Sequence, residues 1–320
     1  MPRRVAPDRT VAVVGATGAV GRVTLRLLRE RGYERVRAFA SARSAGQMLE
    51  GGLRVEEATP DALEAGGVDL ALFSVGTSAS RELVPHAVAG GAAVVDKSSA
   101  YRLEPGIPLV VPEVNGDRVA DHDGILANPN CCTIPLTCVL KPLHDTAGLR
   151  SVRVSTYQAA SGKGAARAEQ LRQEPVEQHD VGFDWAWEGA ETDEEAKIRA
   201  ESQKVLELPD LPISATTVRV PVLVGHAESV WIELESELTP EQAEAVLAEA
   251  PSVRLVDTPT PAASARTDEV LVGRVRRDPA AESGLVLFLA CDNLNKGAAL
   301  NAVQIAERVL DTAWRPLTSA

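Results

Sequence analysis

The chain has 320 residues, of which 45% are apolar and 24% charged, and at about 150 residues per domain this length suggests two globular domains. A net charge of −12, with no run of Lys and Arg, argues against a nucleic-acid partner. The start, Met-Pro-Arg-Arg, is too short and polar for a secretory signal, and no apolar run approaches ~20 residues. We therefore expect a cytoplasmic protein with no membrane partner.

Strands and helices alternate through the first part of the chain, a pattern that predicts a parallel sheet. The first strand, Thr-Val-Ala-Val-Val over 10–14, is continuously apolar, as buried parallel strands are. Further strands are expected over 36–40, 69–74, 92–96, 108–111 and 124–127, and helices over 23–29 and 80–89. The pattern indicates an α/β domain that ends near residue 127.

A glycine-rich turn joins the first strand to the first helix. Gly15-Ala-Thr-Gly18-Ala-Val-Gly21 has three glycines at the spacing that lets a backbone approach a pyrophosphate at a helix N-terminus. We predict a Rossmann dinucleotide-binding domain over 1–127, the alternative being a tight turn without a ligand. The expected cofactor contacts in this turn are Gly15, Thr17, Gly18, Ala19 and Val20.

The loop after the second strand indicates which dinucleotide binds. Sites that prefer NAD carry an acid here for the ribose 2′-hydroxyl, whereas this chain has Ser41, Arg43 and Ser44. An arginine flanked by hydroxyls suits a 2′-phosphate, so the sequence favours NADP(H). The alternative is a solvated surface loop.

A cysteine follows the last predicted strand of this domain, in Asn128-Pro-Asn-Cys131-Cys132-Thr133. The amides of the helix predicted over 134–143 would stabilise a thiolate at Cys131, which suits a nucleophile that attacks a carbonyl carbon. The alternative is a small buried core residue. The four cysteines (131, 132, 138 and 291) have neither metal nor disulfide spacing, so we expect reduced thiols and no metal.

The second half mixes period-two and helical patterns. Residues 150–158 alternate apolar and polar side chains, and further strands are expected over 217–224, 229–235, 253–256, 270–275 and 284–290. Helices are expected over 165–178, 192–206, 239–250 and 296–310. This predicts a mixed, largely antiparallel sheet with helices on one face. Residues 179–191 have no period and hold two tryptophans, which fits an interface, a lid or a packed loop.

Ten stretches in order resemble the aspartate-β-semialdehyde dehydrogenase family over nearly the full length. They are GATGAVG (15–21), SARSAG (41–46), SSAYR (98–102), VPEVN (111–115), NPNC (128–131), STYQAASGKG (155–164), ESQK (201–204), SATTVRVPVLVGH (214–226), DEVLVGRVRRDP (268–279) and DNLNKGAALNAVQIAE (292–307). The resemblance implies a Rossmann domain over 1–127, completed by a C-terminal helix over 296–312. It also implies a catalytic and dimerisation domain over 128–295, α+β and of the glyceraldehyde-3-phosphate dehydrogenase type, in a homodimer or homotetramer.

The family's reaction is the NADPH-dependent reductive dephosphorylation of L-aspartyl 4-phosphate. It yields L-aspartate 4-semialdehyde and phosphate through a cysteine acyl-thioester, in biosynthesis of lysine and diaminopimelate, threonine and methionine. The resemblance implies that Cys131 is the nucleophile, with Cys132 a packed neighbour, that His226 is the acid/base, and that Gln158 orients the substrate. Arg219 would bind the substrate α-carboxylate and Glu201 its α-ammonium.

The remaining implied contacts concern phosphate and the nicotinamide half of the cofactor. Lys204 and Arg102 match the phosphate-binding residues, and Ser161, Gly162 and Asn293 match positions that line the nicotinamide half. The chain departs from the family at Lys97, where asparagine is common, at Pro135, where glutamine is common, and in a shorter segment between Gln158 and Glu201. That segment contributes to the dimer contact and the active-site cover in the family.

Two alternatives accompany this interpretation. One is reduction of a related acyl phosphate such as N-acetylglutamyl phosphate, although its acetylated amine carries no charge for Glu201 to pair. The other is a catalytically idle paralogue that binds NADPH as a partner or sensor protein.

Overall fold

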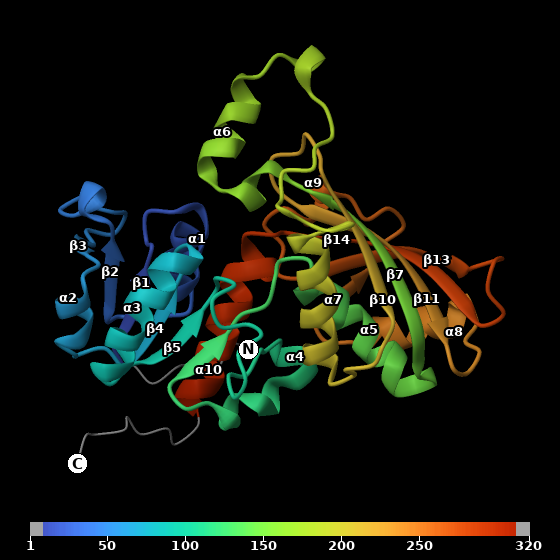
Figure 1. Cartoon of the computed structure of the whole chain (residues 1–320), viewed down its shortest axis with the longest axis horizontal. Coiled ribbons are helices and arrows are strands. Elements are labelled where there is room, and N and C mark those ends of the chain that lie inside the picture. Colours follow the sequence, from blue (N-terminus) through green and yellow to red (C-terminus); the bar gives the residue numbers. More distant parts are fainter. Residues whose placement is uncertain (1–8, 312–320) are drawn as a thin grey trace. The chain divides into compact units, whose positions relative to one another are not determined.

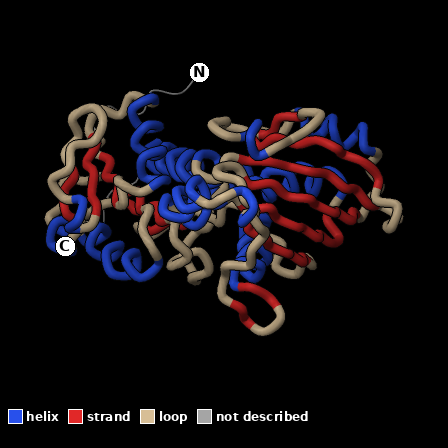
Figure 2. Tube along the Cα trace, turned by 90° about the horizontal axis from the view of Figure 1, so that it is seen from above, coloured by secondary structure: helices blue, strands red, loops and turns tan. Residues whose placement is uncertain are grey.

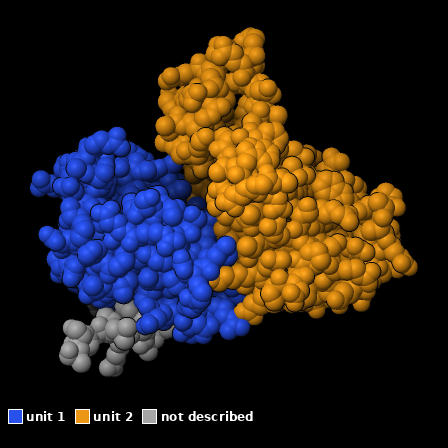
Figure 3. Space-filling view, viewed as in Figure 1, with its two compact units in different colours: residues 1–129, 298–320 blue, residues 130–297 orange. Residues whose placement is uncertain are grey.

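The computed structural model describes residues 9–311, which belong to two units (Figure 3). Unit 1 comprises residues 1–129 and 298–320, and unit 2 comprises residues 130–297. The boundary expected from the sequence falls after residue 127, and the boundary between the units falls after Pro129. In the described range, no helix has the length and apolar character required to cross a membrane.

Unit 1 contains a six-stranded parallel sheet in the order β3-β2-β1-β4-β5-β6. The predicted Rossmann fold is confirmed, because strand order reverses beside β1 as in doubly wound nucleotide-binding sheets. The strands are β1 (Val11–Val14), β2 (Val36–Ala40), β3 (Val55–Glu57), β4 (Leu70–Phe73), β5 (Ala93–Asp96) and β6 (Ile125–Ala127). The helices are α1 (Ala19–Glu30), α2 (Pro60–Glu64), α3 (Thr77–Ala89), α4 (Pro112–Asn115) and α10 (Asn301–Asp311).

Helix α10, the last helix of the described residues, completes this core. Every residue of β1, β4 and β5 is buried, so both faces of the sheet need an apolar cover. Helix α10 contacts β4, β5 and α1, and presents Ala302, Val303, Ile305, Ala306 and Val309 to the core. The nucleotide-binding sheet therefore depends on a helix that begins 174 positions after the end of β6, its last strand (Figure 1).

Unit 2 contains a mixed six-stranded sheet in the order β10-β7-β11-β14-β13-β12. The three inner pairings are antiparallel and the two outer pairings are parallel, which confirms the predicted mixed sheet. The strands are β7 (Leu149–Gln158), β10 (Ile213–Arg219), β11 (His226–Leu234), β12 (Val253–Leu255), β13 (Val270–Arg277) and β14 (Gly284–Cys291).

Helices α5 (Thr133–Ala147), α7 (Asp193–Leu206) and α8 (Pro240–Ala248) form a layer against this sheet. Helix α5 packs on β7, β11 and β14 and touches both other helices, while α7 packs on β10. Thr192 fixes the start of α7 through a capping box with Glu195. Polar side chains are thus brought together at the inward-facing ends of β7, β10 and β11 and at the starts of α5 and α7.

A less regular segment links β7 to α7. It contains α6 (Ala165–Gln173) and a two-stranded hairpin of β8 (Trp187–Glu188) and β9 (Glu191–Thr192), seen as the isolated strand pair in Figure 2. Figure 1 shows α6 standing away from the sheet of unit 2. The segment exposes Val176, Val181, Phe183 and Trp187.

Two predicted elements in unit 2 are wrong in extent. The strand expected over 217–224 spans Ile213–Arg219 instead, because β10 pairs residue for residue with β7 and Pro221 has no N–H for a ladder. The helix expected over 165–178 ends at Gln173, since Glu174 precedes a proline and adopts an extended conformation.

Two further differences concern a strand expected in unit 1 and the helix expected where the chain returns from unit 2 to unit 1. The strand expected over 108–111 is reduced to a single bridge between Leu109 and Ala127. The helix expected over 296–310 begins as a π-helix over Asn295–Leu300 before continuing as α10. Such wide turns occur often at functional sites, and this one accompanies the passage from unit 2 to unit 1.

Candidate active site

Cys131 lies in the turn immediately before α5. Cys132 is the N-cap of this helix, and its N–H donates to the Asn130 side-chain oxygen at 2.8 Å. Cys131 is half-buried, whereas Cys132 is fully buried. The helix N-terminus favours negative charge, so the turn offers Cys131 the environment of a reactive thiolate. All four cysteines lie in the described range, and none is in a disulfide bond.

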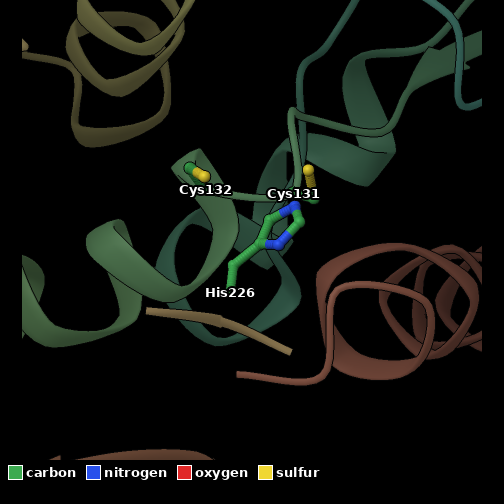
Figure 4. A group of neighbouring side chains, drawn as sticks. All are labelled: Cys131, Cys132 and His226. Carbon is green, nitrogen blue, oxygen red and sulfur yellow. The ribbon is translucent and has the colours of Figure 1, made fainter. Parts of the chain in front are cut away.

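His226, the first residue of β11, brings its imidazole to this turn. The Sγ atoms of Cys131 and Cys132 and a ring nitrogen of His226 all lie within 4.8 Å of one another. Figure 4 shows Nε2 turned towards Cys131. His226 as a residue is 1% exposed, so its contacts are fixed by packing. A thiol and an imidazole from elements 95 positions apart in sequence are thereby placed together, as acyl-transfer chemistry requires.

The backbone of Ala159 determines the tautomer of this histidine. Its N–H donates to His226 Nδ1 at 2.9 Å, so Nδ1 has no proton and the neutral ring carries its proton on Nε2. Nε2 is buried and has no hydrogen-bond partner among the described residues. In this tautomer the nitrogen that faces Cys131 donates and does not accept. The same proton opposes metal ligation by Nε2, although three potential ligands lie close together.

Glu194 connects two amides of the site. Its Oε1 accepts from Asn130 Nδ2 at 2.9 Å and from Gln158 Nε2 at 3.1 Å. These bonds fix which way both amides point: Asn130 Oδ1 meets the N–H of Cys132, and Gln158 Oε1 faces Arg219 Nη1 at 3.5 Å. Burial raises the pKa of Glu194, and the Cys131 charge raises it further. Glu194 thus orients Gln158, a role absent from the sequence-based interpretation.

Arg219 ends β10 and is 6% exposed. Its Nη1 donates to the carbonyl of Ala159 at 2.9 Å, and its Nε and Nη2 donate to Asp184 Oδ1 at 3.3 and 3.2 Å. Its guanidinium carbon lies 4.5 Å from the ring centre of Trp185, a cation–π distance. The fork predicted to bind a substrate carboxylate therefore already holds a carboxylate of the chain.

Glu201 and Lys204 occupy successive turns of α7. Glu201 is 1% exposed, and its Oε2 accepts the backbone N–H of Asn130 at 2.6 Å. The acid expected to bind the α-ammonium therefore also supports the turn that carries Cys131. Lys204 is partly exposed near the end of the same helix. This hydrogen bond connects Glu201 to the cluster around Cys131.

The three residues expected near the nicotinamide also meet. Ser161 Oγ and the Asn293 side chain hydrogen-bond at 3.0–3.2 Å, and the N–H of Gly225 donates to Asn293 Oδ1 at 2.9 Å. At Gly162, an added Cβ would lie 2.9 Å from Arg219 Nη1 and 3.1 Å from His226 Nε2. Only glycine fits there without moving one of these side chains.

A second buried acid, Glu228, lies two residues after His226 on the same face of β11. It is fully buried, and neither carboxyl oxygen has a nitrogen or oxygen partner among the described residues. Burial raises the pKa of Glu228 well above its usual value, as does the nearby Cys131 charge, while a hydrogen bond with the Cys132 thiol opposes the shift. Burial therefore favours the neutral form of this carboxyl beside Cys131.

The glycine-rich turn in unit 1 fits a dinucleotide diphosphate. Gly15 has a φ of 90°, and a Cβ on Gly21 would lie 2.2 Å from the Gly15 carbonyl oxygen, so both positions require glycine. Helix α1, which is described throughout, has no acidic residue in its first turn. Ala19 and Val20 begin that helix, so its N-terminal amides face the turn that a phosphate would occupy.

The loop after β2 forms a short 3₁₀ turn over Ala42–Ser44. Thr17 and Ser44 hydroxyls approach to 3.4 Å, which joins this loop to the glycine-rich turn. Arg43 is exposed, as an arginine that receives a phosphate from solvent would be, and Ser41 precedes it in an extended conformation. The loop and the turn together therefore offer hydroxyl, guanidinium and backbone N–H donors, groups that suit phosphate oxygens.

Arg102 lies in the loop after β5, in unit 1. Its Nη2 donates to the carbonyl of Lys97 at 2.7 Å. Lys97 Nζ is buried and has no hydrogen-bond partner among the described residues. Burial lowers the pKa of Lys97 to about 7, although the charge of Asp96 opposes the shift. Asp96 itself accepts from Ser80 and Ser98.

The chain combines a nucleotide-binding sheet with a unit that holds a paired thiol and imidazole, and both parts match the semialdehyde dehydrogenase class. The family model for the semialdehyde dehydrogenase NAD-binding domain matches residues 10–122, and the model for the dimerisation domain matches residues 140–296. A curated relative, the aspartate-semialdehyde dehydrogenase of Corynebacterium melassecola, is 46% identical across 93% of this chain and 98% of its own.

Two solved structures extend this likeness to the whole fold. Aspartate semialdehyde dehydrogenase II of Vibrio cholerae, in complex with ASA, superposes with a TM-score of 0.90 at 36% identity, over 97% of this chain and all of that one. The enzyme of Candida albicans with NADP superposes with a TM-score of 0.76 at 25% identity, over 94% and 98% of the two chains. The chain belongs to the aspartate-semialdehyde dehydrogenase family and is an oxidoreductase with an NAD(P)-binding domain and a dimerisation domain.

Proposed function

We propose that the protein reduces L-aspartyl 4-phosphate to L-aspartate 4-semialdehyde and phosphate with NADPH, through an acyl-thioester on Cys131. The observation that supports this most directly is the cluster in unit 2, where Cys131, His226, Gln158, Glu201 and Arg219 surround one turn. The cluster supplies a nucleophile, a hydrogen-bond donor, and groups of both charges for an amino acid. Membership of the aspartate-semialdehyde dehydrogenase family also supports this substrate.

In the first half-reaction the Cys131 thiolate attacks the acyl carbon. A C–S bond forms, the C–O bond to phosphate breaks, and phosphate leaves with both electrons of that bond. The His226 Nε2–H donates a hydrogen bond to the anionic oxygen during the attack, a role that fits the tautomer set by Ala159. Acceptance of the thiol proton by Nε2, the base role implied by the resemblance, would first require loss of the Ala159 bond.

In the second half-reaction the thioester carbon is reduced and the C–S bond breaks, which releases the aldehyde and restores the Cys131 thiolate. Bound NADPH supplies the hydride. The one proton consumed overall ends on phosphate. The side chains of this unit other than Cys131 therefore need only orient and stabilise: Gln158 positions the acyl group, and Nε2–H of His226 stabilises successive anions.

Arg219 and Glu201 would hold the α-carboxylate and α-ammonium, Arg102 and Lys204 the phosphate, and Ser161, Gly162 and Asn293 the nicotinamide half. The glycine-rich turn with Ser41, Arg43 and Ser44 would hold the phosphates of NADP. We further propose a homodimer or homotetramer in the cytoplasm, where thiols stay reduced. The matched dimerisation domain supports the oligomer.

The test is phosphate-dependent reduction of NADP⁺ with L-aspartate 4-semialdehyde, followed by the nicotinamide absorbance. Turnover that requires phosphate and prefers NADP⁺ to NAD⁺ is expected. A preference for N-acetylglutamate semialdehyde would mean that the substrate is the related acyl phosphate, N-acetylglutamyl phosphate, and not L-aspartyl 4-phosphate. Binding of NADPH without turnover of either aldehyde would favour the idle paralogue.

A further inference from the structure

The segment just before the β8–β9 hairpin is tied to the end of β10. Gly182 and Arg219 exchange both backbone hydrogen bonds, at 2.9 and 2.8 Å, as an isolated antiparallel bridge. This bridge places the two residues that follow shortly after Gly182 over the Arg219 side chain: Asp184 binds the edge of the guanidinium and Trp185 covers its face. The contact joins the irregular segment directly to the candidate substrate site.

The donors of Arg219 divide into two sets. Nη1 is held by the chain itself, through Ala159 and Gln158. The Nε–Nη2 edge, which offers the parallel pair of N–H groups suited to a carboxylate, is occupied by Asp184. A substrate carboxylate bound by two parallel hydrogen bonds needs this edge. Both carboxylates cannot occupy it together.

Asp184 carries a negative charge and can be displaced from Arg219. Partial burial acts against ionisation, but hydrogen bonds and charge from Arg219 and Lys163 outweigh it and hold the pKa of Asp184 below its usual value. Its side chain is 22% exposed, and Lys163 Nζ lies 3.2 Å from Oδ2. Lys163 is 51% exposed, so an Asp184 released from Arg219 retains a cationic partner in solvent. The side chain of Arg219 is 8% exposed, so its buried guanidinium needs a carboxylate partner, and exchange of Asp184 for a substrate carboxylate preserves one.

We propose that Asp184 is an internal competitor for the substrate carboxylate on Arg219, displaced each time substrate binds. The proposal rests on the role proposed above for Arg219. Asp184 then determines specificity, because only a ligand with its own carboxylate can replace the bonds that Arg219 loses. Trp185, adjacent in sequence and stacked on the same guanidinium, moves with it and reports the exchange.

The first experiment compares Asp184→Asn with Asp180→Asn, a matched control at an exposed position of the same segment whose carboxylate accepts from the neighbouring Val181 N–H. The neutral amide competes less well for a guanidinium, so the KM for L-aspartate 4-semialdehyde should fall about three- to tenfold while kcat does not rise. The control should leave KM unchanged. A raised KM would mean that Asp184 only orients Arg219, and an unchanged KM would mean that no competition exists; either result overturns the proposal.

The second experiment follows tryptophan fluorescence during titration with succinate, a dicarboxylate that undergoes no reaction. A saturable change is expected in the wild type, lost in Trp185→Phe and shifted to lower succinate concentration in Asp184→Asn. A signal that persists in Trp185→Phe would place the change elsewhere and overturn the displacement. Since this binding needs no turnover, failure of the dehydrogenase assay would remove the proposed function and leave this test intact.

Discussion

The nucleotide site in unit 1 and the catalytic cluster in unit 2 differ in the chemical groups that form them. The first depends on backbone: glycines that permit close approach and amides at the start of α1, with side chains added at the loop after β2. The second depends on side chains from the turn before α5 and from α7, β7, β10 and β11 that meet only after the mixed sheet has formed. A short sequence window can therefore define the first site, but the second needs the whole unit.

The sharpest test of a site made of side chains is removal of the proposed nucleophile. Cys131→Ala should lower kcat/KM by at least about 10³-fold, because no other group forms the thioester. NADPH affinity, measured by fluorescence titration, should persist because Cys131 is not one of the proposed cofactor contacts. Cys132→Ala, at a fully buried neighbour, should keep most activity. Alkylation and mass mapping that found the reactive thiol at Cys132 would reverse this assignment.

Arg219→Lys tests whether geometry or charge binds the substrate. Lysine keeps the charge but cannot donate two parallel hydrogen bonds, each worth about 1.5–3 kcal/mol. The value of kcat/KM should therefore fall by a factor of between about ten and several hundred. Binding of NADPH to the variant should stay normal. Near-normal catalytic efficiency of the variant would exclude bidentate hydrogen bonding of Arg219 to the substrate α-carboxylate.

Gly21→Ala is the corresponding test in unit 1, because it adds one methyl to a site made of backbone. The new Cβ would lie 2.2 Å from the Gly15 carbonyl oxygen, so the turn must shift. We expect a loss of about 1–3 kcal/mol in unfolding free energy and a ten- to hundredfold weaker NADP⁺ affinity. Thr17→Ala, which removes a hydroxyl contact of 3.4 Å, should change the affinity only a few-fold. The reverse order would show that side chains dominate this site too.

Arg43→Ala removes the one cationic side chain in the 3₁₀ turn after β2. The KM for NADP⁺ should rise about tenfold and that for NAD⁺ hardly at all, because only NADP⁺ carries the 2′-phosphate. Steady-state kinetics with both cofactors measures the ratio. Equal changes for the two cofactors would remove Arg43 from phosphate recognition.

The smallest expected effect concerns Lys97 and depends on pH. Its folded pKa of about 7 lies below the unfolded value, so the unfolded chain binds more protons between these two values and stability rises with pH across that window. Lys97→Met should therefore raise the unfolding free energy most below pH 7, by about 1–3 kcal/mol more at pH 6 than at pH 10. Lys141→Met, on the partly exposed side of α5, serves as control. A gain independent of pH would mean that Lys97 titrates normally.

The contrast between the units also explains which features the sequence predicted. Strand β1, the glycines after it and the turn before Cys131 each lie within one short window, where periodicity and spacing suffice. The extent of β10 was wrong because its ends are set by pairing with β7, not by its own apolar pattern. The family resemblance indicated Gln158, His226 and Arg219 as individual residues. Their mutual contacts required the sheet register.

Glu194 and Asp184 show what no local pattern contains. Glu194 is 36 positions from Gln158 and 64 from Asn130, and in sequence it is one acid among three at the start of a helix. Asp184 lies in a stretch without periodicity, and only the bridge from Gly182 to Arg219 reveals its role. Likewise, the tautomer of His226 follows from one backbone N–H, which has no sequence signature.

The position of α10 has a consequence for synthesis on the ribosome. Five apolar side chains of this helix, from Ala302 to Val309, belong to the core beneath the parallel sheet of unit 1. Unit 2 is continuous over 130–297 and emerges complete before that helix does. The nascent nucleotide-binding half must therefore persist with an open apolar face while 168 further residues are translated, an interval in which chaperone binding and aggregation compete with folding.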